Sequence, residues 1–352
     1  MKSYSQIYIG IDLHHNQSTV GYMDNDGEYF AKDRIPTTSK ALQGAVVSIT
    51  ADHKHLTIEQ GNMSFWVGEQ LRDYVDRLII CDPRKNSLIS QGLAKNDGLD
   101  AYHLCELLRM GSLKPVWRPK QFGDRRLFFH RIKEHLRLKK SIVANKRQLQ
   151  ATFRHWGYNR TLTKGDYVHP EAALAGIEPA GLARELAEKF TYIQMITRQR
   201  TQLFERIREQ GQKYPEISEF QKMAGAGPIT AHTFSGYLQT PHRFRDRGQL
   251  IRFCQLAVRK YSSNGRRLRA EHLSKAGHGC LKDVAYTIWN GAMKGTNEVS
   301  GFYQASLERC GDKVNARLNT ERKILITLWS IWKHNRTYQP EKFFSANGDS
   351  AR

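Results

Sequence analysis

Residues 7–13 read IYIGIDL, and this stretch decides the fold of the N-terminal part of the chain. Its three isoleucines occupy every second position and therefore share one side of an extended backbone. Asp12 falls on the opposite side. This period of two is typical of a strand with one buried face. The stretch therefore predicts a β-strand that carries an acidic side chain away from its isoleucines.

The surrounding sequence predicts a mixed sheet. Further strands are expected at 18–23, 29–34, 55–59 and 78–81, and helices at 39–50, 64–76 and 97–110. Asn25-Asp26-Gly27 joins the second and third strands and is a typical hairpin turn. Three antiparallel strands followed by alternating helices and strands indicate an α/β domain.

The composition points to a polyanionic partner. The 352 residues include 55 Lys or Arg against 34 Asp or Glu, so the net charge is +21. Such an excess, with a pI near 9.8, is typical of proteins that bind DNA, RNA or an anionic membrane. The mean hydropathy is −0.61 and no apolar run is long enough to span a bilayer, so we expect no membrane partner.

The cysteine pattern and the N-terminus indicate a cytoplasmic protein. The five cysteines are far apart and show no CxxC spacing. We therefore expect reduced thiols, with no disulfide framework and no zinc site. The first residues lack the apolar stretch of a signal peptide. Hydrophobic residues make up 39% of the chain, which excludes wholesale disorder.

Two long helices are predicted beyond a proline-containing linker at 111–123. The first spans 124–156 and the second 182–209, with a proline-containing loop between them. They predict an antiparallel coiled-coil arm, or half of an intermolecular one. The predicted seam positions are Phe129, Ile132, Leu136, Val143, Phe153 and Trp156 in the first helix and Leu182, Leu186, Phe190, Ile193, Ile196, Leu203 and Ile207 in the second, with interruptions at Lys139, Lys146 and Arg200.

The last region combines a glycine turn with a basic segment. Residues 223–231 read MAGAGPITA, which predicts a tight turn that opens a helix. Residues 242–282 contain eleven Lys or Arg and two Asp or Glu, with aromatic residues between them. This segment is a candidate contact with nucleic acid. A further amphipathic helix is expected at 323–334.

Four acidic residues are candidates for metal binding. Asp12 lies in the first strand and Glu59 ends the strand at 55–59. Asp97 and Asp100 are one helical turn apart and share a helix face. Two strand carboxylates and a helical pair can converge at one edge of a sheet, and such oxygen ligands suit Mg²⁺ or Mn²⁺. Taken singly, residues of this kind are more often solvated carboxylates or helix caps.

Three further residues near these acids or strand ends are interpreted as structural. His14 and His15 closely follow Asp12 and could touch substrate or metal, but Mg²⁺ prefers oxygen, so we interpret them as loop residues. Asp82 could be a fifth acid, but it precedes Pro83 and is interpreted as part of a turn.

The ordered set of motifs resembles a known family. Residues 9–12 (IGID), the strand-ending Glu59 and residues 95–101 (KNDGLDA) resemble the RuvC-like domain of the DEDD insertion-sequence transposases, with the K-x-D-x-x-D-A signature matched in full. Three later motifs extend the resemblance, at 225–231 (GAGPITA), 259–265 (RKYSSNG) and 274–278 (SKAGH). The family is the insertion-sequence family numbered one hundred and ten, with its eleven-eleven branch and the Piv-type DNA invertases.

The resemblance implies an architecture and a metal site. It implies a RuvC-like (RNase H-like) α/β catalytic domain at 1–115, a helical coiled-coil dimerisation arm at 116–215, a mainly α C-terminal transposase domain at 216–340, and a tail at 341–352. The residues that it implies to be catalytic and to bind Mg²⁺ or Mn²⁺ are Asp12, Glu59, Asp97 and Asp100.

The resemblance also implies a catalytic serine. The matching position is Ser263, and its neighbour Ser262 is the alternative. A serine hydroxyl needs a base, a metal or a cationic field to act as a nucleophile. Without the resemblance, a surface turn with solvated arginines is the simpler interpretation. The residues expected to supply this field or to bind nucleic acid are Arg259, Lys260, Arg266, Arg267, Arg269, Lys275, Arg125, Arg126, Lys139 and Lys140.

The implied function is RNA-guided DNA transposition by a homodimer or homotetramer. The acids and the serine would form a composite site, and a structured noncoding RNA would pair with donor and target DNA. The implied location is the bacterial or archaeal cytoplasm, with nucleoid association. The alternatives are a site-specific DNA invertase without a guide RNA, a RuvC-like junction-resolving endonuclease that needs no serine, and a non-catalytic nucleic-acid-binding protein.

Overall fold

The computed structural model describes residues 4–83, 97–117, 123–259, 262–263, 266–267 and 272–344. The chain forms two compact units, Met1–Lys120 and Gln121–Arg352. The first is a mixed α/β unit and the second is mostly helical, as the sequence predicts.

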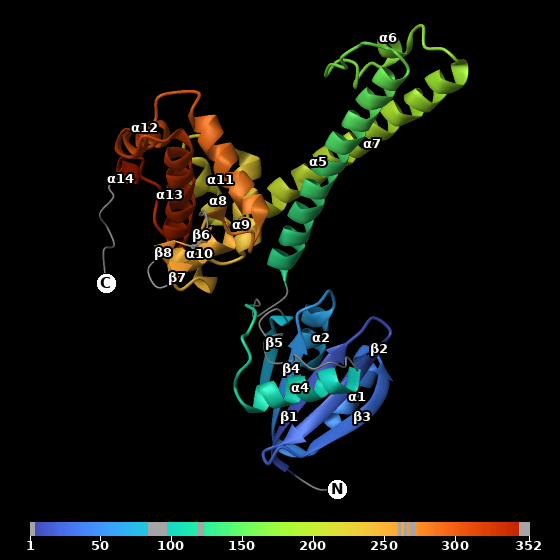
Figure 1. Ribbon diagram of the computed structural model, residues 1–352, viewed down its shortest axis with the longest axis vertical. Coiled ribbons are helices and arrows are strands. Elements are labelled where there is room, and N and C mark those ends of the chain that lie inside the picture. The colour runs from blue at the N-terminus through green and yellow to red at the C-terminus, as the bar shows by residue number, and fades with distance from the viewer. Residues whose placement is uncertain are drawn as a thin grey trace. The chain divides into compact units, whose positions relative to one another are not determined.

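A five-stranded sheet forms the centre of the first unit (Figure 1). Its strands are β1 (Tyr4–Leu13), β2 (Gln17–Asp24), β3 (Tyr29–Pro36), β4 (Ala51–Glu59) and β5 (Arg77–Cys81). They lie in the order β3-β2-β1-β4-β5. The first three strands pair antiparallel, whereas β4 runs parallel to both β1 and β5. The predicted mixed sheet is therefore confirmed, and β4 begins earlier than expected.

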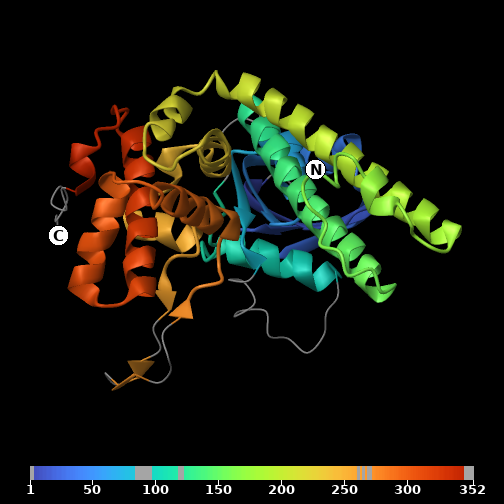
Figure 2. The ribbon, with the colours of Figure 1, turned by 90° about the horizontal axis from the view of Figure 1, so that it is seen from above.

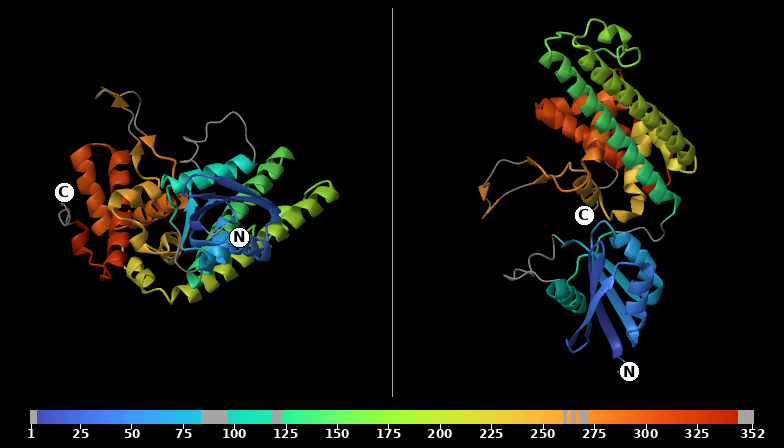
Figure 3. Two further views of the ribbon diagram at one scale, coloured as in Figure 1. Left: turned by 90° about the horizontal axis from the view of Figure 1, so that it is seen from below. Right: turned by 90° about the vertical axis from the view of Figure 1, so that its right-hand side faces the viewer.

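Helices cover both faces of this sheet (Figure 3). The helices of the unit are α1 (Ser39–Val47), α2 (Ser64–Leu71), the short 3-10 helix η1 (Arg72–Tyr74) and α4 (Asp97–Arg109). α1 and α2 pack on the isoleucine face of β1, where Ile9 is fully buried. α4 packs on the opposite face, where Leu104 and Leu107 belong to one buried apolar cluster with Cys81 of β5. The alternation in β1 thus separates an apolar core from the face that carries Asp12.

A two-helix arm opens the second unit. It consists of α5 (Asp124–His155), α7 (Ala180–Gly211) and the loop between them, which contains the short α6 (Glu171–Leu174). α5 and α7 lie side by side (Figures 1 and 2). They are antiparallel, because Gln210 near the end of α7 donates to the Asp124 carbonyl at 2.7 Å, while Phe153 near the end of α5 lies 6.3 Å from Phe190. Both predicted long helices are confirmed.

The predicted seam of α5 is wrong at several positions. The buried side chains are Phe128, Ile132, His135, Ile142, Leu149 and Phe153. Val143 is 41% exposed and Trp156 50% exposed. Apolar residues are adjacent at 128–129 and at 142–143, and the first of each pair is the buried one. The Phe128 ring packs against the rings of Tyr214 and His232, with ring centres 4.8 and 6.1 Å away. In α7 the predicted seam is confirmed at Leu182, Leu186, Phe190, Ile193, Ile196 and Ile207.

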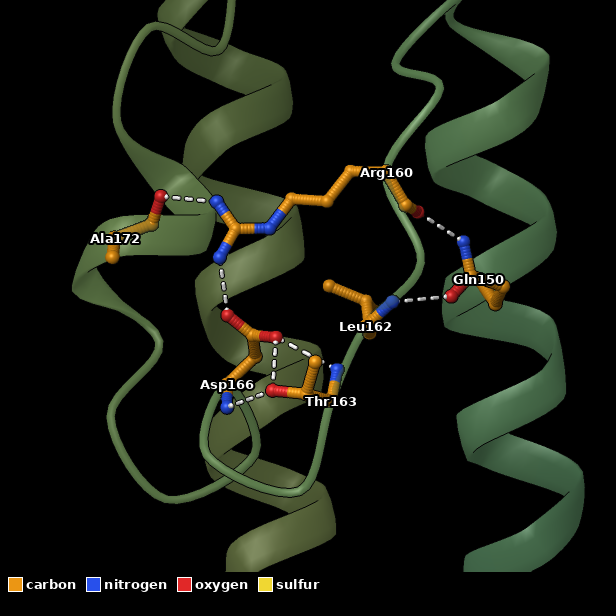
Figure 4. Close-up of polar contacts among 6 residues, drawn as sticks. All are labelled: Gln150, Arg160, Leu162, Thr163, Asp166 and Ala172. Carbon is orange, nitrogen blue, oxygen red and sulfur yellow. Dashed lines mark hydrogen bonds and ion pairs between the residues drawn. The ribbon is translucent and has the colours of Figure 1, made fainter.

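A polar network fixes the loop at the tip of the arm (Figure 4). The Asp166 carboxylate accepts hydrogen bonds from the backbone N–H and the hydroxyl of Thr163, each at 2.7 Å, and it pairs with Arg160. Arg160 also donates to the Ala172 carbonyl at 2.8 Å. The Thr163 hydrogen bonds, followed by Arg160, lower the pKa of Asp166. The carboxylate therefore stays charged and holds the loop in place.

Short helices form the body of the second unit. They are α8 (Pro215–Gln221), α9 (Pro228–Leu238), the 3-10 helix η2 (Pro241–Arg243), α10 (Arg247–Phe253), α11 (Gly279–Ala292), α12 (Glu298–Cys310), α13 (Lys313–Lys333) and α14 (Glu341–Phe344). α9 begins after the predicted glycine turn, where Gly225 has φ +80° and a Cβ would meet the Ile288 carbonyl of α11. α13 begins earlier than predicted, because the Asp312 side chain accepts a hydrogen bond from the Asn315 N–H. No described helix is long and apolar enough to cross a bilayer.

Candidate active site

Two parallel strands carry Asp12 and Glu59 to one edge of the sheet. β1 pairs with β4 in a register that places Ile11 opposite Ile58, so the two acids are the next residues along each strand. Ile11 and Ile58 are both buried in the core under α1 and α2. Since successive side chains alternate between faces, both acids belong to the face that α4 covers. Glu59 is exposed, and the Asp12 side chain is 18% exposed.

α4 directs its first turn toward the same edge. Its middle packs on Gly10, where a Cβ would lie 2.6 Å from the Ala101 carbonyl oxygen and 2.9 Å from the Leu104 Cβ. Its last residue, Arg109, donates to the carbonyl of Asn25 at 3.4 Å, in the hairpin near the other end of β1. α4 therefore runs antiparallel to β1, and its N-terminal turn lies toward the Asp12 end of that strand.

The first turn of α4 contains the other two predicted acids. Asp97 is its first residue, and the Asp97 side chain lies outside the described part of the chain. Asp100 is exposed. Burial raises the pKa of the Cys105 thiol, next to Gly10, to about 12. The side of α4 that packs on Gly10 of β1 is thus uncharged at Cys105. The two acids lie in the N-terminal turn of α4, beyond this contact.

His14 is a neighbour of Asp12 that the sequence interpretation placed in the loop. Its Nε2 lies 3.0 Å from the Asp12 Oδ2, and its side chain is 59% exposed. Its position in the sequence, two residues after an acid near the end of a strand, could have predicted this contact. An imidazole here can hold the Asp12 carboxylate in one orientation.

The residues of this edge fit a hard divalent cation by their chemistry. Carboxylate oxygens are the ligands that Mg²⁺ and Mn²⁺ prefer. The backbones of β1 and β4 bring Asp12 and Glu59 to one end of the sheet, and the first turn of α4 lies toward the same end. Among the described side chains, which exclude Asp97, no group of three His, Cys, Asp or Glu could hold a metal ion. The candidate site consists of four acidic residues, Asp12, Glu59, Asp97 and Asp100, which we call the acidic edge.

The predicted serine lies in a short ribbon of the second unit, which stands away from the helices of that unit (Figures 2 and 3). β7 (Ser262–Ser263) pairs antiparallel with β8 (Arg266–Arg267), with Ser263 opposite Arg266 and Ser262 opposite Arg267. The ribbon side chains lie outside the description. The backbone register places an arginine opposite each serine.

Other predicted cations of this segment are less fully described. Arg259 ends β6 (Val258–Arg259), which pairs with β9 (His272–Leu273), and its side chain is outside the description. Lys260 and Arg269 lie outside the described residues altogether.

Specific contacts anchor the root of the ribbon to the end of α10. The Gln255 side chain donates to the carbonyls of Lys275, at 2.7 Å, and Gly277, at 3.0 Å. The His278 N–H donates to the Phe253 carbonyl at 2.7 Å. Gly277 has φ +115°, and a Cβ there would meet the same Phe253 carbonyl, so only glycine fits. Residues 274–278 (SKAGH) thus connect the ribbon to the end of α10 through hydrogen bonds. The sequence did not predict this role.

One predicted nucleic-acid contact is used inside the second unit. Arg125 donates to Glu216 Oε1 at 2.7 Å and to Ser235 Oγ at 2.8 Å, and its guanidinium lies 3.7 Å from the centre of the Tyr214 ring. A buried carboxylate therefore neutralises its charge, and we remove Arg125 from the predicted contacts. The predicted contacts with exposed side chains are Arg126, Lys139, Lys140 and Lys275.

A comparison with protein families identifies a relationship for part of the second unit. Residues 218–304 match the family model described as Transposase IS116/IS110/IS902 family. The match begins in α8, ends in α12 and includes the serine ribbon. It supports a DNA transposase or recombinase and leaves the acidic edge outside its range. No curated protein matches the chain.

Proposed function

We propose that the chain is an RNA-guided DNA transposase in which the acidic edge binds Mg²⁺ or Mn²⁺ and Ser263 is the nucleophile. The observation that supports this proposal is the convergence of Asp12 and Glu59 through the parallel register of β1 and β4, with the first turn of α4 toward the same end of β1. A structural role for these acids would not require that convergence. The family match at 218–304 supports the coarser part of the proposal, a transposase or recombinase role.

The proposed reaction is a pair of phosphoryl transfers. The Ser263 Oγ attacks a DNA phosphorus, its proton passes to solvent, and a phosphoserine bond forms as the bond from phosphorus to the 3′ oxygen breaks. The 3′ oxygen takes up a proton. A 3′ hydroxyl of another strand end then attacks the phosphoserine, which restores a phosphodiester and releases the serine hydroxyl. Bound divalent ions would stabilise charge on the attacking and leaving oxygens.

The register of the ribbon favours phosphate binding at the serine. Arg266 and Arg267 stand opposite the two serines in the antiparallel pair. Guanidinium groups donate paired hydrogen bonds to phosphate oxygens and stabilise negative charge that develops during transfer. Arg266 and Arg267 are therefore the residues proposed to supply these cations.

The two adjacent serines provide a matched test. We expect Ser263→Ala to abolish both recombination and the covalent protein–DNA adduct, because the nucleophile is removed, whereas Ser262→Ala leaves both intact. The adduct is measured on a denaturing gel with end-labelled DNA that carries the element's ends. Loss of the adduct in Ser262→Ala alone would move the nucleophile to that residue. Normal cleavage in both variants would favour a junction-resolving endonuclease.

The acids and the guide are tested in the same assay. Asp12→Asn should lower strand cleavage by roughly a thousandfold, since metal binding supplies several kcal/mol of transition-state stabilisation. A silent Asp12→Asn would indicate a binding protein. Sequencing of RNA that co-purifies with the protein should return one transcript from the element's flank. Recombination without RNA would favour an invertase.

A further inference from the structure

A row of exposed cations runs along α5. Five residues of this helix, each seven positions after the one before, are all Lys or Arg, and all five side chains are exposed. The buried residues His135, Ile142 and Leu149 are also seven apart, so positions with this spacing keep one orientation toward the seam with α7. The five cations therefore form a single line on the outside of the arm, which we call the arm row. Its members are Arg126, Lys133, Lys140, Arg147 and Arg154.

Acidic residues do not balance the charge of the arm row. α5 contains ten Lys or Arg and two Asp or Glu, whereas α7 contains six and four. Other exposed cations of the arm have acidic partners, since Arg137 pairs with Glu134 at 2.7 Å and Arg208 with Glu205 at 3.1 Å. The four members of the row from Lys133 onward make no ion pair with any residue that the structure describes. Their charges are therefore available to an anionic partner.

The arm row begins beside the root of the serine ribbon. The Lys133 Nζ lies 5.5 Å from the centre of the Phe129 ring, and the Phe129 ring centre lies 5.0 Å from that of Tyr237 in α9. The Tyr237 ring centre in turn lies 5.7 Å from that of His278, which ends the SKAGH segment at the ribbon root. Desolvation, followed by the charges of Arg243 and Lys133, lowers the pKa of His278. The row therefore runs from the ribbon root outward along the arm.

The length of the arm row suits a nucleic-acid duplex. Its first and last members are 28 residues apart, which corresponds to about 42 Å of helix. A DNA duplex carries one negative charge per about 1.7 Å of its axis and stays nearly straight over this length. About twelve base pairs therefore match the row from end to end. A second copy of the arm would present the same positive row and would be repelled on this face.

The position of the arm row favours DNA as the duplex. The proposed function puts the scissile phosphate at the serine ribbon, so the duplex that continues from that phosphate passes the ribbon root, where the row begins. The family match, which includes Tyr237 and His278, also supports action on DNA. We propose that the arm row binds the phosphate backbone of the DNA duplex that flanks the scissile bond, over about twelve base pairs. The identity of the duplex rests on the proposed function, whereas the test of binding does not.

The salt dependence of DNA binding tests this inference. The full-length protein is titrated into a fluorescein-labelled DNA duplex of about 40 base pairs, and anisotropy is measured at several salt concentrations. The triple variant Lys140→Gln, Arg147→Gln and Arg154→Gln removes the outer three cations of the row, and glutamine keeps the helix propensity. Each lost phosphate contact lowers the slope of log K against log salt by about 0.9, so we expect a fall of about 2.7. Affinity at about 150 mM salt should fall at least about tenfold.

Two controls separate the location of the charges from their number. Lys294→Gln, Arg309→Gln and Lys313→Gln together remove three exposed cations from the body of the unit and should leave the slope unchanged. The exchange R147Q/Q148R, at two exposed positions, keeps the net charge and moves one cation by about 100° around α5. It should lower the slope by about 0.9, as Arg147→Gln alone does. Circular dichroism checks that each variant is folded.

The outcomes separate this inference from the proposed function. An unchanged slope in the row variant, equal losses in the two triple variants, or normal binding by the exchange variant would overturn the arm row as a DNA site. A larger loss for an RNA duplex of the same sequence would assign the row to RNA and refute the proposal. A protein that recombines DNA without any effect of the row would leave the proposed function intact. Row-dependent DNA binding by a protein that neither cleaves nor joins DNA would do the reverse.

Discussion

The sheet of the first unit and the arm of the second differ in the continuity of their cores. Apolar side chains cover both faces of the sheet, with Ile9 buried on one face and Leu104 on the other. The arm has one apolar cluster around Phe153 at its tip and another around Phe128 at its base. Between them the apolar seam is interrupted, although each helix contains 32 residues without a break.

A polar contact occupies the interruption. The Arg200 Nη2 lies 3.2 Å from the His135 Nε2, and the His135 Nδ1 and Arg200 Nε have no hydrogen-bond partner among the described residues. A continuous core fixes the groups at its edge, whereas an incompletely satisfied polar layer is a point of low local stability. The strand residues that precede Asp12 and Glu59 are thus fixed by the core of the sheet, and we expect the arm to be least stable at its middle.

The largest expected effect comes from disturbing the contact between α4 and β1. A Cβ on Gly10 would lie 2.6 Å from the Ala101 carbonyl oxygen, so Gly10→Ala must displace α4. We expect the free energy of unfolding to fall by about 3 kcal/mol. DNA cleavage should fall by at least about a hundredfold, because a 1 Å misplacement of catalytic groups costs that much. Chemical denaturation and the cleavage assay measure both effects.

Gly44→Ala is the matched control for this substitution. Gly44 lies in α1, and a Cβ there would meet nothing within 4 Å. The change should stabilise the first unit by up to about 1 kcal/mol, since alanine favours a helix, and should leave cleavage unchanged. Equal effects of the two substitutions would show that the position of α4 on β1 does not matter for activity.

The same contrast explains how much of the molecule could be predicted from its sequence. In a strand the period of two allows a single assignment of faces, so the face of β1 that carries Asp12 could be predicted from the sequence. The pairing of β1 with β4, which brings Asp12 next to Glu59, could not. In α5, adjacent apolar residues at 128–129 and 142–143 allow two seams, and tertiary packing, such as that of Phe128 on Tyr214 and His232, decides between them. The pairing of Arg125 with Glu216 and the anchoring of the ribbon by Gln255 depend on partners distant in sequence, which no local pattern reveals.

The corrected seam predicts different effects at two neighbouring positions of the arm. Ile142 is 9% exposed and Val143 is 41% exposed. Ile142→Ala should lower the free energy of unfolding of the arm by about 2.5 kcal/mol, because it leaves a cavity where the seam is already interrupted. Val143→Ala should change it by less than about 0.5 kcal/mol. Hydrogen exchange of the arm amides measures both, and the opposite order would restore the original seam.

The smallest expected effect is a pH dependence at the polar layer of the arm. Burial, followed by the charge of Arg200, lowers the pKa of His135 from 6.5 to about 4. Between pH 6.5 and pH 4 the unfolded chain binds a proton at this histidine and the folded chain does not, so stability falls as the pH falls through this window. We expect a loss of about 2 kcal/mol by pH 4.5.

The control for this pH dependence is His135→Leu, measured by denaturation at pH 7 and at pH 4.5. The variant leaves Arg200 without its acceptor at both pH values, so that cost cancels in the difference between them. The part of the pH dependence that comes from His135 should then disappear, and the variant should gain stability relative to the original protein as the pH falls. If the two proteins lose the same stability, His135 is already protonated in the folded arm, and the polar layer would be a pair of like charges rather than a neutral acceptor beside an arginine.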